Sequence, residues 1–120
     1  MSDPTVIASS PDLDGVACVV IVTRAREGVC ERLFFESDRL PGFFERDVQE
    51  KLPGRYTLAL CGLDVVHTSW DGELIRPGLM DALRDFVSPV LWFSARHWQP
   101  EDRAAVAHII GEARLRIAEN

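Results

Sequence analysis

Short apolar segments alternate with turn residues and helical patterns along the whole chain, and this alternation constrains the fold most strongly. Four segments are expected as strands, at residues 5–8, 32–35, 56–61 and 90–93. Helices are expected at 43–51, at 79–87 and from Pro100 onward, where the apolar stripe comprises Val106, Ile109, Ile110, Ala113 and Ile117. The segment at 62–78, with Gly72 and Pro77 as breakers, is expected to be irregular. Strands that alternate with helices predict a parallel sheet covered on both faces.

The length of the chain sets the number of domains. With 120 residues, it is expected to form one domain over residues 1–120. The fold class predicted is α/β: a three-layer, Rossmann-like domain with a parallel sheet of four, or alternatively five, strands. A residual site is expected at the carboxyl edge of that sheet.

The charge balance bears on the class of partner. The net charge is -6, and none of the 13 basic residues forms a run. Non-specific nucleic-acid binding requires a basic field that releases counterions from the phosphate backbone. No strong nucleic-acid binding is therefore expected.

The cysteines and the apolar segments bear on the compartment. Cys18, Cys30 and Cys61 are odd in number, far apart in sequence and without a Cys-x-x-Cys spacing, so neither a disulfide framework nor a zinc site is expected. No secretory signal is recognised at the start, and the longest apolar run, 16–22, is too short to span a bilayer. These features favour a soluble cytoplasmic protein with no membrane association.

A motif follows the first expected strand: residues 12–15 read Asp-Leu-Asp-Gly, before the apolar run 16–22. This motif resembles the Asp-x-Asp-Gly opening motif of the DHH phosphoesterase superfamily. The strand at 90–93 runs into residues 94–97, Ser-Ala-Arg-His, where that family carries its Asp-His-His signature. The resemblance covers nearly the whole chain and implies a helix at 16–22, although valine and isoleucine favour a strand there.

The resemblance also implies a degenerate metal site. Family members hold two manganese ions with about six ligands, and such a pair activates the attacking water. Here Asp12 and Asp14 are kept, and Ser10 replaces a histidine of the family. The position of the family's strand-end aspartate is occupied by Cys61 or Gly62. The signature aligns with residues 94–96. No counterpart of the family's C-terminal substrate-binding domain is expected. Two ligands cannot hold two hard cations close together. The residual site at the positions of these motifs comprises Asp12, Asp14, Gly15, Arg96 and His97.

Each of these residues has a functional and a structural interpretation. Asp12 and Asp14 either bind one Mn²⁺ or Mg²⁺ weakly, or cap the following helix. Arg96 either pairs with these two aspartates in place of a cation, binds a phosphate, or lies on the surface. His97 becomes a metal ligand if the alignment is shifted by one residue. No other cofactor is expected.

The remaining histidines, Cys61 and the tryptophans also have alternative roles. His67 is expected in a loop. Alternatively, it forms a mixed metal site or a nucleophile pair with Cys61. The simpler role of the Cys61 thiol is that of a buried core group. His108 is expected to pack beside the apolar stripe of the last helix. The tryptophans are assigned as follows: Trp92 to a core strand, and Trp70 and Trp98 to loops that either cover the former active site or contact a partner.

Three functional hypotheses follow. The first is a non-catalytic DHH-like domain that acts by binding a protein partner, a second copy of itself or a retained nucleotide. The second is a divalent-metal-dependent phosphoesterase acting on a small phosphoester or short oligonucleotide through Asp12, Asp14, His97 and His67. The third is one subunit of a split enzyme. The loss of ligands beside a well-patterned core favours the first.

Overall fold

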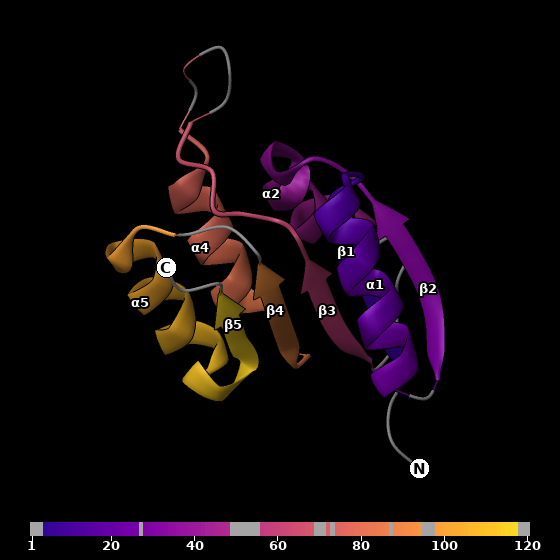
Figure 1. Cartoon of the computed structure of the whole chain (residues 1–120). Coiled ribbons are helices and arrows are strands. Elements are labelled where there is room, and N and C mark those ends of the chain that lie inside the picture. The colour runs from indigo at the N-terminus through magenta and orange to yellow at the C-terminus, as the bar shows by residue number, and fades with distance from the viewer. Residues whose placement is uncertain are drawn as a thin grey trace.

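The computed structural model describes residues 4–26, 28–48, 56–68, 72, 74–86, 88–94 and 98–117, in which strands and helices alternate (Figure 1). The strands are β1 (Thr5–Ser9), β2 (Val29–Phe34), β3 (Thr57–Cys61), β4 (Val90–Ser94) and β5 (Leu115–Ile117). The α-helices are α1 (Leu13–Ala25), the short α2 (Leu40–Gly42), α4 (Arg76–Asp85) and α5 (Pro100–Ile110). The other helical segments are 3₁₀ turns at Ser37–Arg39 and Glu112–Arg114 and a π-helical segment at Phe43–Asp47.

The strands form one parallel sheet in the order β2-β1-β3-β4-β5. The chain leaves β1 for β2 on one side and then crosses to β3 on the other, so the direction of winding reverses between β1 and β3. In open α/β sheets, ligands bind outside the carboxyl ends of the strands at such a reversal. At this point Ser9, the last residue of β1, lies opposite Cys61, the last residue of β3.

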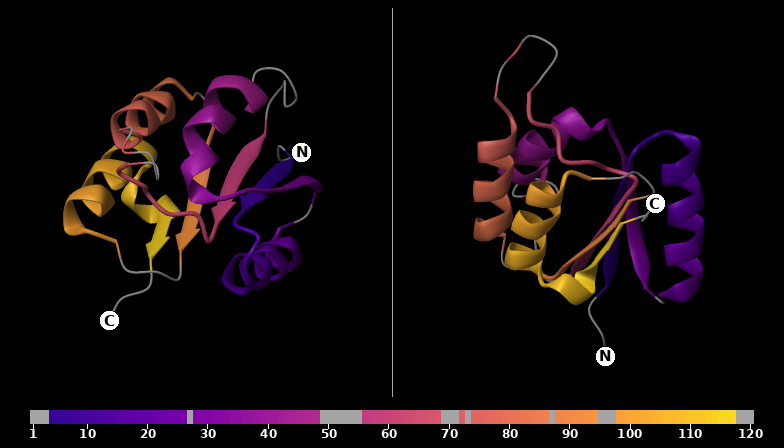
Figure 2. Two further views of the ribbon diagram at one scale, coloured as in Figure 1. Left: turned by 90° about the horizontal axis from the view of Figure 1, so that it is seen from above. Right: turned by 60° about the vertical axis from the view of Figure 1, so that its left-hand side comes forward.

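The helices are divided unequally between the two faces of the sheet (Figure 2). Of the described helices, α1 is the one that lies on the first face, where it packs on β1 and β3 through Val19 and Val22. On the opposite face lie α2, α4 and α5, over the larger apolar core. That core includes a chain of aromatic contacts from Phe35 through Phe43 and Phe44 to Phe86 and Tyr56.

The predicted fold class is confirmed, with five strands as the correct alternative. The helix predicted at 16–22 is also confirmed, as part of α1. A helix forms there despite the strand propensity, because Asp12 caps the helix and because the helix packs Val19 and Val22 on the sheet.

The predicted last helix is too long. It ends at Ile110, because Gly111 adopts a positive φ of 99° that stops the helical path. The chain then returns to the sheet, so Ala113 lies in a 3₁₀ turn and Ile117 in β5. Both residues were predicted to continue the apolar stripe of the helix.

The two middle helices begin earlier than their apolar patterns predict. Helical structure leading to Phe43 already starts at Ser37, and the predicted end at Lys51 lies outside the described residues. The helix predicted from Leu79 begins at Arg76, with Pro77 in its first turn instead of breaking the chain. Proline is compatible with that position because the first N–H groups of a helix have no partner within the helix.

Candidate functional site

The turn between β1 and α1 carries the residues of the opening motif. Asp12 has an extended backbone, and its Oδ1 atom accepts a hydrogen bond from the Gly15 N–H at 2.9 Å. The same oxygen accepts a bond from the Ser10 hydroxyl, also at 2.9 Å. Asp12 is thus the N-cap of α1, as its structural interpretation predicted.

Gly15 and Gly62 allow this turn to lie directly against the end of β3. A Cβ atom added to Gly15 would lie 2.3 Å from the Ser10 carbonyl oxygen, and one added to Gly62 would lie 2.9 Å from the Gly15 Cα. Gly62 also has a positive φ of 70°. The Ser10 hydroxyl, 2.5 Å from either added Cβ, fills the space between the two glycines. Backbone and serine atoms therefore occupy the crevice at the β1–β3 reversal.

Asp64 is the acidic side chain at this edge that the alignment missed. The strand-end aspartate was expected at Cys61 or Gly62, but the acid lies farther along the chain, after β3. Its Oδ1 atom accepts hydrogen bonds from the Ser94 hydroxyl at 2.8 Å and from the Trp98 indole N–H at 3.1 Å. Its N–H donates to the Ser37 hydroxyl at 2.9 Å. Asp64 thus joins the ends of β2, β3 and β4.

Asp14 lies apart from the cap and borders a groove of about 630 Å³ beside α1. The groove begins at the carboxyl edge of the sheet and follows the helix to Arg26, which binds Thr5 at the start of β1. Most of its lining is apolar. The lining residues are Asp14, Ala17, Cys18, Ile21, Val22, Ala25 and Arg26 from α1 and its end, with Gly62, Leu91, Phe93, Ser94 and Arg116 from the sheet side.

Cys18 and Cys61 form a thiol pair that their separation in sequence did not suggest. Cys61 is fully buried under α1, and Cys18 lines the groove. A hydrogen bond from the Cys61 thiol lowers the pKa of Cys18, although burial opposes this shift. The same bond, together with burial and the charge of a Cys18 thiolate, raises the pKa of Cys61. Cys18 is therefore the more acidic thiol of the pair, and both thiols are reduced.

His67 contacts an acid that the sequence patterns did not single out. Its Nε2 atom lies 2.7 Å from Oδ2 of Asp102, a residue of α5 that is 3% exposed. The Nε–H of Arg76 donates to the other oxygen of Asp102 at 2.6 Å. The loop after β3 is thereby tied to the starts of α4 and α5. Because Cys61 pairs with Cys18, the proposed nucleophile pair of Cys61 and His67 has no support.

The remaining members of the predicted residual site, Arg96 and His97, lie outside the described residues, as does Trp70. Within the described ranges, no three histidine, cysteine, aspartate or glutamate side chains are arranged to hold a metal ion. Asp12 and Asp14 have different surroundings, since the first caps the helix and the second borders the groove.

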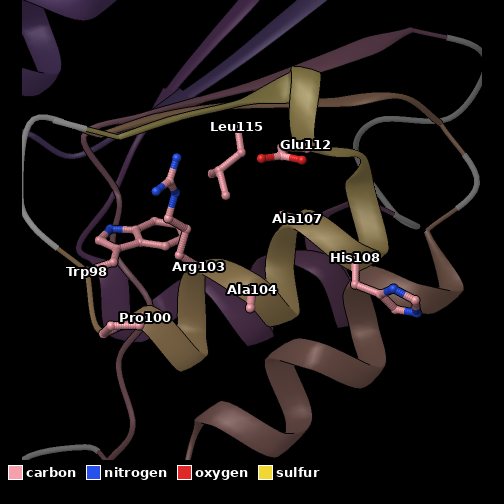
Figure 3. A pocket seen from close by; sticks show the side chains of 8 residues that line it. All are labelled: Trp98, Pro100, Arg103, Ala104, Ala107, His108, Glu112 and Leu115. Atoms are coloured by element: carbon pink, nitrogen blue, oxygen red, sulfur yellow. The ribbon is translucent and has the colours of Figure 1, made fainter. Parts of the chain in front are cut away.

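A second hollow, of about 550 Å³, lies between α5 and β5 (Figure 3). Arg103 and Glu112 both border it, so neither sign of charge dominates. Trp98 forms one wall but is only 6% exposed, with its ring edge-to-face against Trp92, so it offers little surface to a partner. His108 is exposed and its ring turns away from the other labelled side chains, so its predicted packing role is wrong.

Comparisons of the chain with protein-family models, with curated protein sequences and with solved structures gave no match. None of the helices in the described ranges has the length and apolar character that crossing a bilayer requires.

Proposed function

We propose that this chain is a non-catalytic, DHH-like binding domain that docks a protein partner on the face of the sheet that carries α1. The observation that carries this proposal is the apolar outer side of α1. Leu13 and Ile21 are 83% and 67% exposed, and Val16 and Val20 are exposed beside them. A helix that only borders a core is normally polar on its outward side, whereas a helix that is apolar all round is normally buried.

Ile21 also lines the groove beside α1, which carries apolar surface from this residue onto the sheet. Leu91 and Phe93 of β4 are half-buried and border it. In the described part of the chain no second helix covers β4 on this face (Figure 2). A continuous apolar surface with charged groups at its margin, here Asp14 and Arg26, is typical of a protein interaction site.

The contacts of the acidic residues favour binding over hydrolysis. Asp12 accepts two hydrogen bonds that stabilise the start of α1, and Asp64 accepts two that join strand ends. These hydrogen bonds give both acids a structural role. A reducing cytoplasm is the compartment that suits the proposal, because the Cys18–Cys61 pair would remain as thiols there.

Binding of 8-anilinonaphthalene-1-sulfonate tests the surface directly. The probe combines an apolar ring system with an anionic group, and the groove combines apolar walls with Arg26 and Arg116. At low protein concentration we expect saturable fluorescence enhancement that Ile21→Lys abolishes. Leu74→Lys is the matched control, because Leu74 is a similarly exposed apolar residue that does not line the groove. No saturable enhancement, or equal loss in both variants, would contradict the proposal.

A manganese titration tests the hydrolytic alternative. We expect no saturable heat when Mn²⁺ is added to the full chain, and no difference between the wild type and Asp12→Asn/Asp14→Asn. Saturable heat that the double variant loses, together with hydrolysis of a phosphodiester, would replace the binding proposal with the phosphoesterase one.

A further inference from the structure

A regular stripe of residues runs along the outward side of α1. Asp14, Ala17, Ile21 and Arg24 follow one another at intervals of three, four and three residues. This is the spacing by which one helix forms a straight seam with another. The two inner residues, Ala17 and Ile21, are apolar and border the groove. The two outer residues carry opposite charges.

We propose that the partner docked on this face is a second copy of the chain, with the two α1 helices packed antiparallel around a two-fold axis. This inference rests on the proposed docking function and identifies its partner. In an antiparallel pair whose two-fold axis lies at the level of Val19 along the helix, residues equally far from Val19 in sequence face each other. Ile21 of each copy then lies opposite Ala17 of the other. A large side chain thus meets a small one twice, which is how well-packed surfaces interlock.

The charges at the ends of the stripe select the antiparallel orientation. Asp14 of each copy lies opposite Arg24 of the other, so two ion pairs form at the ends of an apolar seam. A parallel pair would instead place Asp14 beside Asp14 and Arg24 beside Arg24. Like charges that face each other across an interface disfavour that arrangement. The surface therefore complements itself in charge.

The second helix then lies along the α1 side of the groove. In the pair, α1 of one copy packs against Ala17 and Ile21 of the other, which form part of the helix side of the groove. A stable interface of this kind removes about 800 Å² per copy from solvent, roughly a tenth of a small protein's surface. The accessible surface of one copy is 7440 Å².

Analytical ultracentrifugation of the full chain over a range of concentrations tests the inference. We expect a concentration-dependent monomer–dimer equilibrium. Ile21→Lys should raise the dissociation constant at least about thirtyfold, because it removes a central apolar contact from both halves of the interface. Leu74→Lys, outside the seam, should leave it unchanged. A chain that stays monomeric at all concentrations while its groove still binds the fluorescent probe would overturn the second-copy inference and leave the docking function intact.

Charge reversal tests the orientation. Asp14→Arg and Arg24→Asp should each weaken the homodimer about tenfold or more, because like charges then face each other twice. Mixing the two variants should restore a heterodimer, in which both pairs are again of opposite sign. If Asp14→Arg alone does not fold, the double variant Asp14→Arg/Arg24→Asp, which should dimerise like the wild type, serves instead. A wild-type dimer that neither single reversal weakens, or a mixture or double variant that fails to restore it, would overturn the antiparallel seam.

Discussion

Replacing Gly15 by alanine should strongly destabilise the protein, because α1 begins in direct contact with the end of β1. The added Cβ would lie 2.3 Å from the Ser10 carbonyl oxygen, 2.5 Å from the Ser10 hydroxyl and 2.6 Å from the Ser9 hydroxyl. None of these atoms can move freely. The carbonyl belongs to the backbone, the Ser10 hydroxyl is bonded to Asp12, and the Ser9 hydroxyl is bonded to the Ser10 carbonyl oxygen at 2.8 Å.

The size of the effect follows from these contacts. Overpacking costs about 1–3 kcal/mol, and loss of one or two hydrogen bonds adds about 1 kcal/mol each. The gain in helix propensity on replacing glycine offsets up to about 1 kcal/mol. We expect a net loss of about 3 kcal/mol in the free energy of unfolding, which for a domain of this size lowers Tm by about 12 °C.

Gly78→Ala is the matched control. Gly78 is the third residue of α4, as Gly15 is the third residue of α1, but in the described part of the chain no atom beyond its own helix turn and chain neighbours lies within 4 Å of its added Cβ. The control should therefore gain up to about 1 kcal/mol from helix propensity alone. Urea unfolding followed by circular dichroism measures both variants. Free energies of unfolding that agree within about 0.5 kcal/mol would refute the close packing at Gly15.

Three further predictions concern the cap, the core tyrosine and the thiol pair. Asp12→Ala should cost about 1–2 kcal/mol in urea unfolding, whereas Asp12→Asn should keep most of the stability, because an amide oxygen also caps a helix. Tyr56→Phe should raise stability by about 1 kcal/mol, because the buried Tyr56 hydroxyl has no hydrogen-bond partner in the described part of the chain. Burial also raises the pKa of Tyr56. The contribution of the neutral Tyr56 to stability should therefore be fully present below pH about 10 and be lost as the pH rises through the higher folded pKa. Alkaline unfolding of the variant should not show this loss. In a Cys30→Ser background, iodoacetamide should modify Cys18 at a lower pH than it modifies a free cysteine. Cys61→Ala should move that pH upward. An unchanged pH profile in this variant would contradict the bond between the thiols.

The sequence predicts the layers of this fold well because they depend on local patterns. Most strand positions follow from apolar runs, although β2 begins at Val29, three residues before its predicted start. The helical state of 16–22 was predicted from the resemblance of the preceding motif to the DHH family and not from propensity. The end of the last helix was missed because Ile117 fits the helical stripe of apolar residues. A strand as short as β5 has too few residues to show a period of its own. Gly111 was the available signal, since glycine often ends a helix.

The site was less predictable because its contacts join distant parts of the chain. The capping role of Asp12 could be read locally from the residues after it. By contrast, Asp64 reaches Ser94 and Trp98 only through the packing of β3, β4 and α5. The contact between Cys18 and Cys61 likewise depends on how α1 crosses the sheet. No spacing rule within one segment reports such contacts.

The buried carboxylate of Asp102 has a consequence for how the native state opens. It binds Arg76 at the start of α4 and His67 in the loop after β3, while Asp102 itself belongs to the first turn of α5. Separating either helix would leave a charge without its partner in an apolar layer, and that is costly. The amide protons of α4 and α5 should therefore exchange with solvent deuterium in a single cooperative step. On the other face, α1 has no such link to these helices within the described residues, and we expect it to open as a separate unit.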